Sequence, residues 1–273
     1  LSYGHRWGDF GWDSSFTFSA NKNEIVELVK DYVHPETGKT YNVDKLELKT
    51  DEGRGFGKAK FILKEGGTLG DLYTHADLKR DINGNILIDD SGNVTAIDNA
   101  GDIKLGSVLP KANLAWNNSF SYKGINAGFL LTARLGGIVY SATQAYLDLY
   151  GVSETSAAAR DAGGVWINGR SRVNPQSFYE VVASQSGLPT YYTYSATNLR
   201  LQEAHIGYTV PRRWLGNVCD INVSLVGRNL WMIYCKAPFD PEAVATTNNY
   251  YQGIDYFMMP STRNIGFNIK INF

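Results

Sequence analysis

The sequence lacks long apolar runs and any strong excess of charge of one sign. No apolar stretch reaches the roughly 18 residues that a membrane-spanning helix needs, so transmembrane helices are excluded. The 26 lysines and arginines nearly balance the 27 aspartates and glutamates, which leaves no global positive field for a phosphate backbone. Nucleic acid is therefore not an expected partner.

Cysteine and histidine are also scarce. Cys219 and Cys235 would lie near opposite ends of any strand that spans both, too far apart for a disulfide. The 4 histidines show no spacing typical of metal ligands. Asp81, Asn83 and Asn85 alternate like the start of a calcium loop, but the later bidentate glutamate is absent and tight turns explain the same residues. Calcium is kept as a minor alternative, and no other cofactor is predicted.

The sequence is rich in residues that favour strands and turns. It has 28 Gly, 17 Tyr, 12 Phe and 6 Trp but only 3 Met. Aromatic residues suit pleated sheets and glycine suits turns. The composition therefore predicts an all-β protein.

Alternating apolar and polar residues mark the individual strands. In residues 265–273 the odd positions are apolar and the even positions are Gly, Asn, Lys and Asn, which predicts a strand with one apolar face. The same period of two occurs in 10–18, 112–122, 125–135 and 220–225. Residues 196–210 alternate too but change parity, which predicts a β-bulge near Gln202 and Glu203. With the N-terminal residues, this indicates about seven strands.

The connections between these strands alternate between short and long. Short turns are expected at Gly8-Asp9, Lys123-Gly124 and 211–218. Long stretches occupy 22–109, 141–195 and 235–261, are rich in Gly, Asn and Asp, and should contain hairpins of their own. Outer-membrane β-barrels have this asymmetry, with short periplasmic turns and long extracellular loops. We therefore expect an antiparallel transmembrane β-barrel segment whose three long loops are extracellular.

Several motifs resemble one family, the SusC/RagA-like TonB-dependent outer-membrane transporters, in consistent order along nearly the whole chain. The resemblance departs from the family at Cys235 and Lys236 and matches poorly in 141–195, which leaves the substrate undefined. The terminal pattern that ends at Phe273 resembles the signal read by the barrel-assembly machinery. The matching stretches are Phe16-Thr17-Phe18-Ser19-Ala20-Asn21-Lys22-Asn23, 118–124 (NSFSYKG), 198–201 with 207–211 (NLRL and GYTVP), 227–242 (GRNLWMIYCKAPFDPE), Gly253-Ile254-Asp255, Pro260 and Arg263.

This resemblance implies a function and partners. The chain would be the C-terminal part of a barrel of about 22 strands, with the plug domain and earlier strands absent from 1–273, and it would not be an enzyme. It would import glycans, oligosaccharides or peptides across the outer membrane of a Gram-negative, Bacteroidota-like bacterium. A SusD-like lipoprotein would be its partner, outer-membrane lipid would surround it, and TonB would engage it through the missing N-terminal region. Leu1 is not a start methionine and no signal peptide is present, as expected for an excerpt of a longer protein.

Two sets of side chains are candidate site residues. Basic residues that alternate with apolar neighbours should face the lumen, because a Lys or Arg facing lipid at the midplane costs roughly 2–4 kcal/mol. They are Arg134, Arg200, Arg228 and Lys270, and we expect them to pair with lumenal Asp or Glu residues such as Asp13 or Asp220. Tyrosines in the long loops are candidate contacts for a ligand or partner: Tyr191, Tyr192, Tyr194, Tyr250, Tyr251 and Tyr256.

Two other architectures compete with this prediction. A secreted all-β carbohydrate-binding module or glycosidase would stack its loop tyrosines on sugars, but its apolar sheet faces would pack against each other. A small complete barrel would need its first and last strands to pair, and about seven strands is fewer than bacterial barrels use. We therefore expect Leu1–Trp7 and Ser261–Phe273 to have partners outside this numbering.

Overall fold

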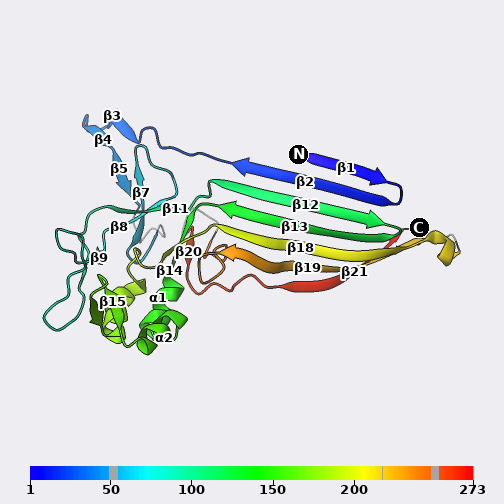
Figure 1. The fold of residues 1–273 in the computed structure, drawn as a ribbon. Helices are drawn as coiled ribbons and strands as arrows, with labels where there is room; N and C mark the ends of the chain where they lie inside the picture. The colour runs from blue at the N-terminus through cyan, green and yellow to red at the C-terminus, as the bar shows by residue number, and fades with distance from the viewer. Residues whose placement is uncertain (49–54, 217, 247–251, 273) are drawn as a thin grey trace.

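A large antiparallel sheet dominates the computed structural model, which describes residues 1–48, 55–216, 218–246 and 252–272 (Figure 1). Its seven strands lie side by side in chain order, so every predicted strand is confirmed. No helix in the described ranges combines the length and apolarity needed to cross a membrane. The strands are β1 (Ser2–Trp7), β2 (Phe10–Ala20), β12 (Ala112–Tyr122), β13 (Ile125–Leu135), β18 (Asn198–Val210), β19 (Asp220–Cys235) and β21 (Asn264–Asn272).

The register gives the sheet one apolar and one polar face, because directly opposed residues of an antiparallel pair point to the same side. One row across five strands is apolar throughout: Phe16, Trp116, Leu131, Leu201 and Trp231. A neighbouring row is mostly polar: Ser15, Asn117, Leu130, Glu203, Arg228 and Asn264. Large apolar side chains such as Phe267 (79% exposed) remain uncovered, unlike the buried faces of a sandwich.

The apolar face has one polar interruption near the middle of the strands. Ser14 and Asn118 oppose each other there. The indole N–H of Trp12 donates to Asn118 Oδ1 at 3.1 Å, and that of Trp116 donates to Ser14 Oγ at 3.0 Å. Asn118 is thereby buried, so these polar groups are covered by neighbouring tryptophans, although Asn118 Nδ2 finds no partner among the described residues.

The predicted turns and bulge are confirmed. Lys123 and Gly124 join β12 to β13 with φ of 46° and 89°, the left-handed pair of a type I′ hairpin turn. The register of β18 against β19 shifts between Leu201 and Glu203. Opposite this shift Asn229 has a φ of 51°, and its Oδ1 accepts a 2.8 Å hydrogen bond from Gln202 Nε2.

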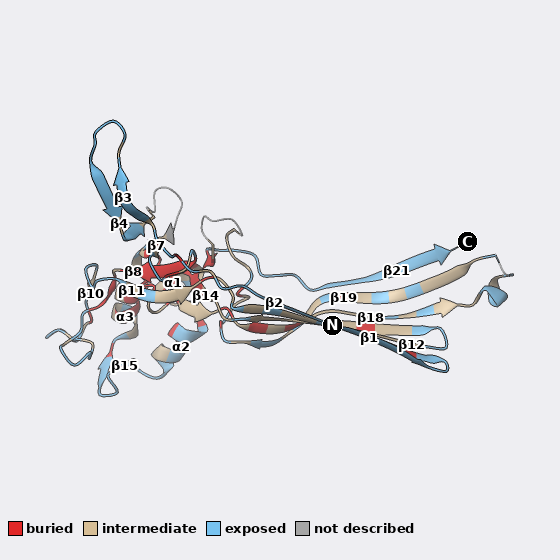
Figure 2. Cartoon of the chain, turned by 90° about the horizontal axis from the view of Figure 1, so that it is seen from above, coloured by how far each residue is buried: buried red, intermediate tan, exposed pale blue. Residues whose placement is uncertain are grey.

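The three long connections, 21–111, 136–197 and 236–263, fold together at one end of the sheet (Figure 1). We call their described residues the cap. The cap holds the hydrophobic core, whereas most residues of the sheet are exposed or of intermediate burial (Figure 2). Leu72, Tyr140 and Ile254, one from each connection, are fully buried in that core. The strand β14 (Ile138–Ser141) pairs with both β17 (Thr193–Ser195) and β20 (Ile254–Asp255), which joins the second connection to the third.

The first connection forms short antiparallel strands, among which β3 and β4 make a hairpin that projects from the cap (Figure 1). A ribbon over 77–97 carries the expected turns, with left-handed Gly84 and Gly92. The strands are β3 (Val29–Val33), β4 (Thr40–Val43), β5 (Lys45–Glu47), β6 (Gly55–Phe56), β7 (Ala59–Lys64), β8 (Asp71–Thr74), β9 (Asp77–Leu78), β10 (Ala96–Ile97) and β11 (Ile103–Ser107).

The second connection contains helices that the sequence analysis did not predict. Ser141, Ser153 and Asn174 cap their N-termini, each side chain accepting a backbone N–H. The expectation of hairpin-bearing loops was therefore incomplete for 141–195. Its elements are α1 (Ala142–Leu149), α2 (Glu154–Asp161), β15 (Val165–Ile167), β16 (Ser171–Val173), α3 (Pro175–Val182) and the 3₁₀ turn η2 (Ser184–Ser186), with a further 3₁₀ turn η3 (Arg212–Leu215) between β18 and β19.

Within the described residues the sheet does not close on itself. The strand β1 pairs with β2 and β21 pairs with β19, and these two edge strands do not pair with each other. This arrangement contradicts the small complete barrel, which required their pairing.

Candidate functional site

The four basic residues predicted to face the lumen all lie on the polar face of the sheet. Opposed pairs place Arg134 with Asn198, and Arg228 with Glu203. The register of β18, β19 and β21 also places Arg200 and Lys270 on this polar face. That this face lines a lumen remains a prediction.

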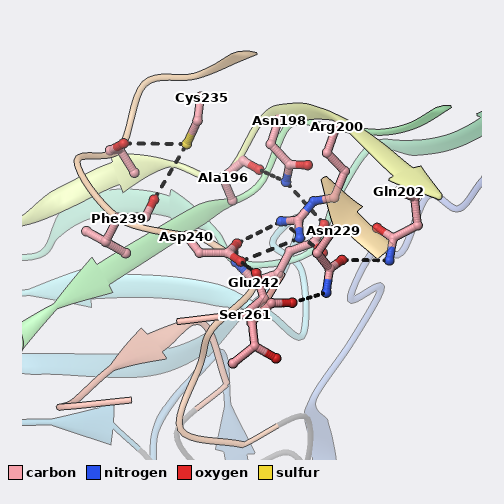
Figure 3. Close-up of polar contacts among 12 residues, drawn as sticks. Ala196, Asn198, Arg200, Gln202, Asn229, Cys235, Phe239, Asp240, Glu242 and Ser261 are labelled. Atoms are coloured by element: carbon pink, nitrogen blue, oxygen red, sulfur yellow. Dashed lines mark hydrogen bonds and ion pairs between the residues drawn. The ribbon is translucent and has the colours of Figure 1, made fainter. Parts of the chain in front are cut away.

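Arg200 forms the most buried ion pair of this face, at the junction between the sheet and the cap (Figure 3). Its Nη2 lies 2.7 Å from Asp240 Oδ1 and 3.3 Å from Glu242 Oε2. The side chain of Arg200 is only 6% exposed. Both carboxylates belong to the third connection, so the pair binds the cap to the wall of the sheet.

Further hydrogen bonds extend this junction (Figure 3). The hydroxyl of Ser261 donates to Asp240 Oδ2, and Asn198 Nδ2 donates to Glu242 Oε1 at 3.1 Å. Asn229 Nδ2 donates to the carbonyl of Thr262 at 3.1 Å. Both ends of the third connection are thus fastened to β18 and β19. Motif stretches that are distant in the sequence, 198–201, 227–242 and 260–263, meet here.

Asp240 is kept ionised by this network. Burial alone would raise the pKa of its carboxyl. Hydrogen bonds from the Ser261 hydroxyl, the Arg200 guanidinium and the backbone N–H of Glu242 outweigh burial, so the net pKa is lowered. The junction therefore holds a charged pair over the ordinary pH range.

Arg134 lies beside the same junction. Its Nη2 donates to the carbonyl of Val108 at 2.9 Å. A cavity of about 320 Å³ on the polar face is lined by Arg134, Gln202 and Glu242 among others. The Nε atoms of Arg134 and Arg200 have no hydrogen-bond partner among the described residues, so both guanidiniums retain donor capacity.

The expected pairing with acidic residues of this face is seen for Arg200 and Arg228, but the two named examples, Asp13 and Asp220, were wrong. Asp220 accepts from Arg212 Nε at 2.9 Å instead. Arg228 pairs with Glu203 at 2.9 Å. In the part of the chain that the structure describes, neither Asp13 nor Lys270 forms an ion pair.

Three of the candidate loop tyrosines pack inside the cap. Tyr192 is 2% exposed and donates to Asp148 Oδ2 at 3.0 Å, so it is a core residue and not an accessible contact. Burial, followed by the charge of Asp148, raises the pKa of Tyr194 to about 12. Tyr191 packs edge-on against Phe178, and burial raises its pKa as well.

The other candidate tyrosines differ in position. Tyr256 is 42% exposed and forms an aromatic group with Phe56, Tyr146 and Phe257. It stays a candidate contact. Tyr250 and Tyr251 lie outside the described residues.

The candidate calcium residues form a tight turn. Asp81 Oδ1 accepts the backbone N–H groups of Asn83 and Asn85, both at 2.8 Å. The side-chain amide of Asn85 contributes most to a lowered pKa of Asp81. Asp89 repeats this turn with Ser91 and Asn93. No group of three or more His, Cys, Asp and Glu side chains in the described ranges is arranged for a metal, and calcium binding stays an untested prediction.

Comparison with known proteins supports the resemblance seen in the motifs. No protein-family model matches the sequence. The TonB-dependent receptor P3 of Formosa agariphila is 25% identical over 289 residues, which cover 96% of this chain and 27% of that protein. The TonB-dependent receptor P26 of the same organism is 25% identical over 98% of this chain and 28% of its own length. The chain thus spans little more than a quarter of the curated relatives it matches.

Solved structures agree on the fold. The RagAB peptide importer in its closed-closed state matches all of this chain with a TM-score of 0.64 and 16% identity, over 28% of the importer chain. Its open-open state matches with a TM-score of 0.56 and 17% identity, over 27% of that chain. The predicted all-β fold, a seven-stranded antiparallel segment of a β-barrel, is therefore confirmed. The relatives carry the names of receptors and importers, not of enzymes.

Proposed function

We propose, from the resemblance to TonB-dependent receptors, that this chain forms part of the barrel wall of an outer-membrane transporter driven by TonB. The transporter would import a glycan or a peptide into the periplasm of a Gram-negative, Bacteroidota-like bacterium. A SusD-like surface lipoprotein would cap it and deliver the cargo. The likeness to the structures of the RagAB peptide importer supports import as the general activity.

The observation that carries the proposal is the two-faced sheet. Apolar side chains of β18, β19 and β21 stay exposed on one face, among them Ile206, Leu225 and Phe267. In water such a surface would promote aggregation, whereas in a bilayer it is the expected outer wall of a barrel. The opposite face carries charged and amide side chains, as a lumen requires.

The cap supports the direction of import. All three long connections leave the sheet at one end, and the turns Gly8-Asp9 and Lys123-Gly124 and the 3₁₀ turn η3 lie at the other. In outer-membrane barrels the long loops are extracellular. The expected loops 22–109, 141–195 and 235–261 would therefore face the outside, where cargo and lipoprotein arrive.

Deleting the gene in its source bacterium tests the proposal. Growth on a panel of polysaccharides and peptides as sole nutrients should fail for one nutrient class and be normal on glucose. Deleting TonB should cause the same failure, because the import step would lose its energy source. Growth that is unchanged on every nutrient, or a defect that persists in glucose, would contradict the proposed activity.

A further inference from the structure

The half of β19 nearer the cap has one free edge. The strand pairs with β18 up to Cys235, but its pairing with β21 ends at Arg228 opposite Asn264. Beyond that point, no described residue forms a backbone hydrogen bond on the side of 230–235 that points away from β18. A further register shift against β18 bends this half without covering its edge. We call 230–235 the free edge.

The sequence of the free edge favours pairing with another strand. Residues 230–235 read Leu-Trp-Met-Ile-Tyr-Cys and contain no charge, proline or glycine. Exposed edges of natural sheets are usually protected by charged residues or proline. Short uncharged segments of high β propensity are the ones that take up a further strand. Trp231 and Tyr234 are 60% and 44% exposed, so described residues leave much of this segment uncovered.

The protein's own chain is kept off the free edge. Residues in front of β21 would continue its ladder with β19, but Pro260 has no N–H to donate. The Ser261 hydroxyl donates to Asp240 (Figure 3). The carbonyl of Thr262 accepts from the Asn229 side chain. These contacts engage the segment in front of β21, so the position beside the free edge stays open.

A cavity of about 390 Å³ lies at this open position. Trp231 lines it from the apolar face of the sheet, and Arg200 and Met232 line it from the polar face. A cavity that is lined by adjacent residues of both faces lies in the plane of the sheet. It therefore lies where a further strand would run, about 4.8 Å from β19. Phe239 and Pro260 add apolar surface to its lining.

Two guanidinium groups beside the cavity retain donor capacity. Arg200 is 5% exposed, and its Nε has no hydrogen-bond partner among the described residues. Arg263, which also lines the cavity, forms no ion pair in the part of the chain that the structure describes. A carboxylate is the group that a guanidinium binds most strongly. The features of the cavity therefore fit an extended, largely apolar polypeptide segment that carries an Asp or Glu.

The position of the free edge indicates which polypeptide supplies that segment. It lies at the end of β19 next to the cap, which the proposed function places outside the membrane. A lipoprotein that covers the cap is held by acyl chains in the neighbouring lipid. The stretch between its acylated cysteine and its folded body, here called the anchor stretch, has to run along the barrel wall. Six extended residues of it would span about 20 Å.

We propose that the free edge of β19 binds the anchor stretch of the surface lipoprotein as an added β-strand. Backbone hydrogen bonds hold the strand, its apolar side chains contact Trp231, and its Asp or Glu pairs with Arg263. The inference rests on the proposed import function, because that function supplies the lipoprotein. It goes further by naming the surface and the segment through which the two proteins are joined.

Photo-crosslinking in the source bacterium tests this contact. The photoreactive residue p-benzoylphenylalanine replaces Trp231 in the full-length transporter, and mass spectrometry identifies the peptide that becomes joined to it. We expect a peptide from the anchor stretch of the lipoprotein. The matched control carries the same group at Leu225, which lies on the same face of β19 but is flanked by Ile206 and Phe267. It should capture no protein.

Two changes separate strand addition from a looser contact. Proline at alternate positions of the anchor stretch removes backbone donors but keeps its length and its acyl chains, so the crosslink yield at Trp231 should fall roughly tenfold. Arg263→Gln should lower the yield roughly threefold, as expected for an exposed ion pair. Lys22→Gln is its matched control, because Lys22 is 87% exposed on the first connection, and it should leave the yield unchanged.

The heat-modifiable folded band shows that each variant has assembled before its yield is compared. No crosslink at Trp231 in the folded transporter would overturn the inference. So would a crosslink to another segment of the transporter, to a second copy of it or to the folded body of the lipoprotein, or a yield that the prolines leave unchanged. If the lipoprotein still co-purifies and TonB-dependent growth persists, the proposed import function stands despite such a result. Loss of both would remove that function instead.

Discussion

The guanidinium of Arg200 on β18 lies 2.7 Å from the carboxylate of Asp240 in the third connection. The two residues are 40 positions apart in the sequence, and both side chains are less than a tenth exposed. A buried pair of this kind adds little net stability when compared with an apolar pair, but breaking it leaves an uncompensated charge. We therefore expect it to fix where the third connection lies.

Asp240→Asn should destabilise the protein by about 3 kcal/mol, because Arg200 would keep only the more exposed Glu242 as an ion partner. The free energy of unfolding in detergent measures this loss. Glu203→Gln is the matched control: its partner Arg228 is 64% exposed, so the cost should stay below about 1 kcal/mol. Equal losses for the two variants would contradict a special role for the buried pair.

The contribution of Asp240 should depend on pH in a defined direction. Its pKa in the folded protein lies below the ordinary value of 3.8, so the folded state favours the carboxylate. The resulting stability is present above that ordinary value and is lost as the pH falls through the folded pKa. The difference in unfolding free energy between wild type and Asp240→Asn should be constant from neutral pH to about pH 5 and shrink below about pH 4. A gap that widens on acidification would refute this assignment.

Much of the sheet could be predicted because its pattern is local. Alternation identified its strands, the change of parity identified the bulge at Gln202, and Lys123-Gly124 identified its hairpin turn. The ion-pair partners of the basic residues could not be predicted in the same way. Asp13 and Asp220 were plausible partners for Arg200. Asp240 contacts Arg200 instead, because the third connection folds back onto β18. No periodic pattern encodes that contact.

The cap was less predictable for two physical reasons. Its helices have only 8 residues each, too few for a clear helical period. Capping signals were nevertheless present, since Ser141 is followed three positions later by Gln144, and Pro175 follows Asn174. The core itself joins residues from three connections, so no single segment of the sequence displays it. Tyr192 illustrates the consequence: a tyrosine in an apparent loop is buried against Asp148.

Asn168 should anchor the ribbon 77–97 to the helical part of the cap. Its Oδ1 accepts from the backbone N–H of Ile86 at 3.1 Å, and its Nδ2 donates to the carbonyl of the same residue at 2.9 Å. Asn168→Gly keeps the left-handed backbone but removes both bonds. Hydrogen exchange at the Ile86 amide should then accelerate roughly tenfold. Asn93→Ala removes a side chain that makes no hydrogen bond to any described residue and should leave that rate unchanged; equal acceleration in both variants would refute the anchoring role.

Leu225 and Ser224, adjacent on β19, test which face of the sheet meets lipid. Leu225 lies on the apolar face and is 54% exposed, whereas Ser224 lies on the polar face. Leu225→Arg should cost roughly 2–4 kcal/mol near the midplane and reduce the heat-modifiable folded band of the barrel. Ser224→Arg places the same charge toward the polar face and should assemble nearly normally. The reverse order would mean that the polar face meets lipid and that Arg134, Arg200, Arg228 and Lys270 do not face a lumen.

Surface labelling of intact cells should place the cap outside the cell. Cys219 and Cys235 are both partly accessible, so they are first replaced by serine. Thr155→Cys then introduces a thiol on the exposed side of α2, and Arg213→Cys introduces one in η3 at the opposite end of the sheet. A membrane-impermeant maleimide should label Thr155→Cys in intact cells, because long loops of such barrels are extracellular. It should label Arg213→Cys only after the outer membrane is opened. Protection of Thr155→Cys until that point, with Arg213→Cys labelled at once, would invert the orientation and place the cap on the periplasmic side.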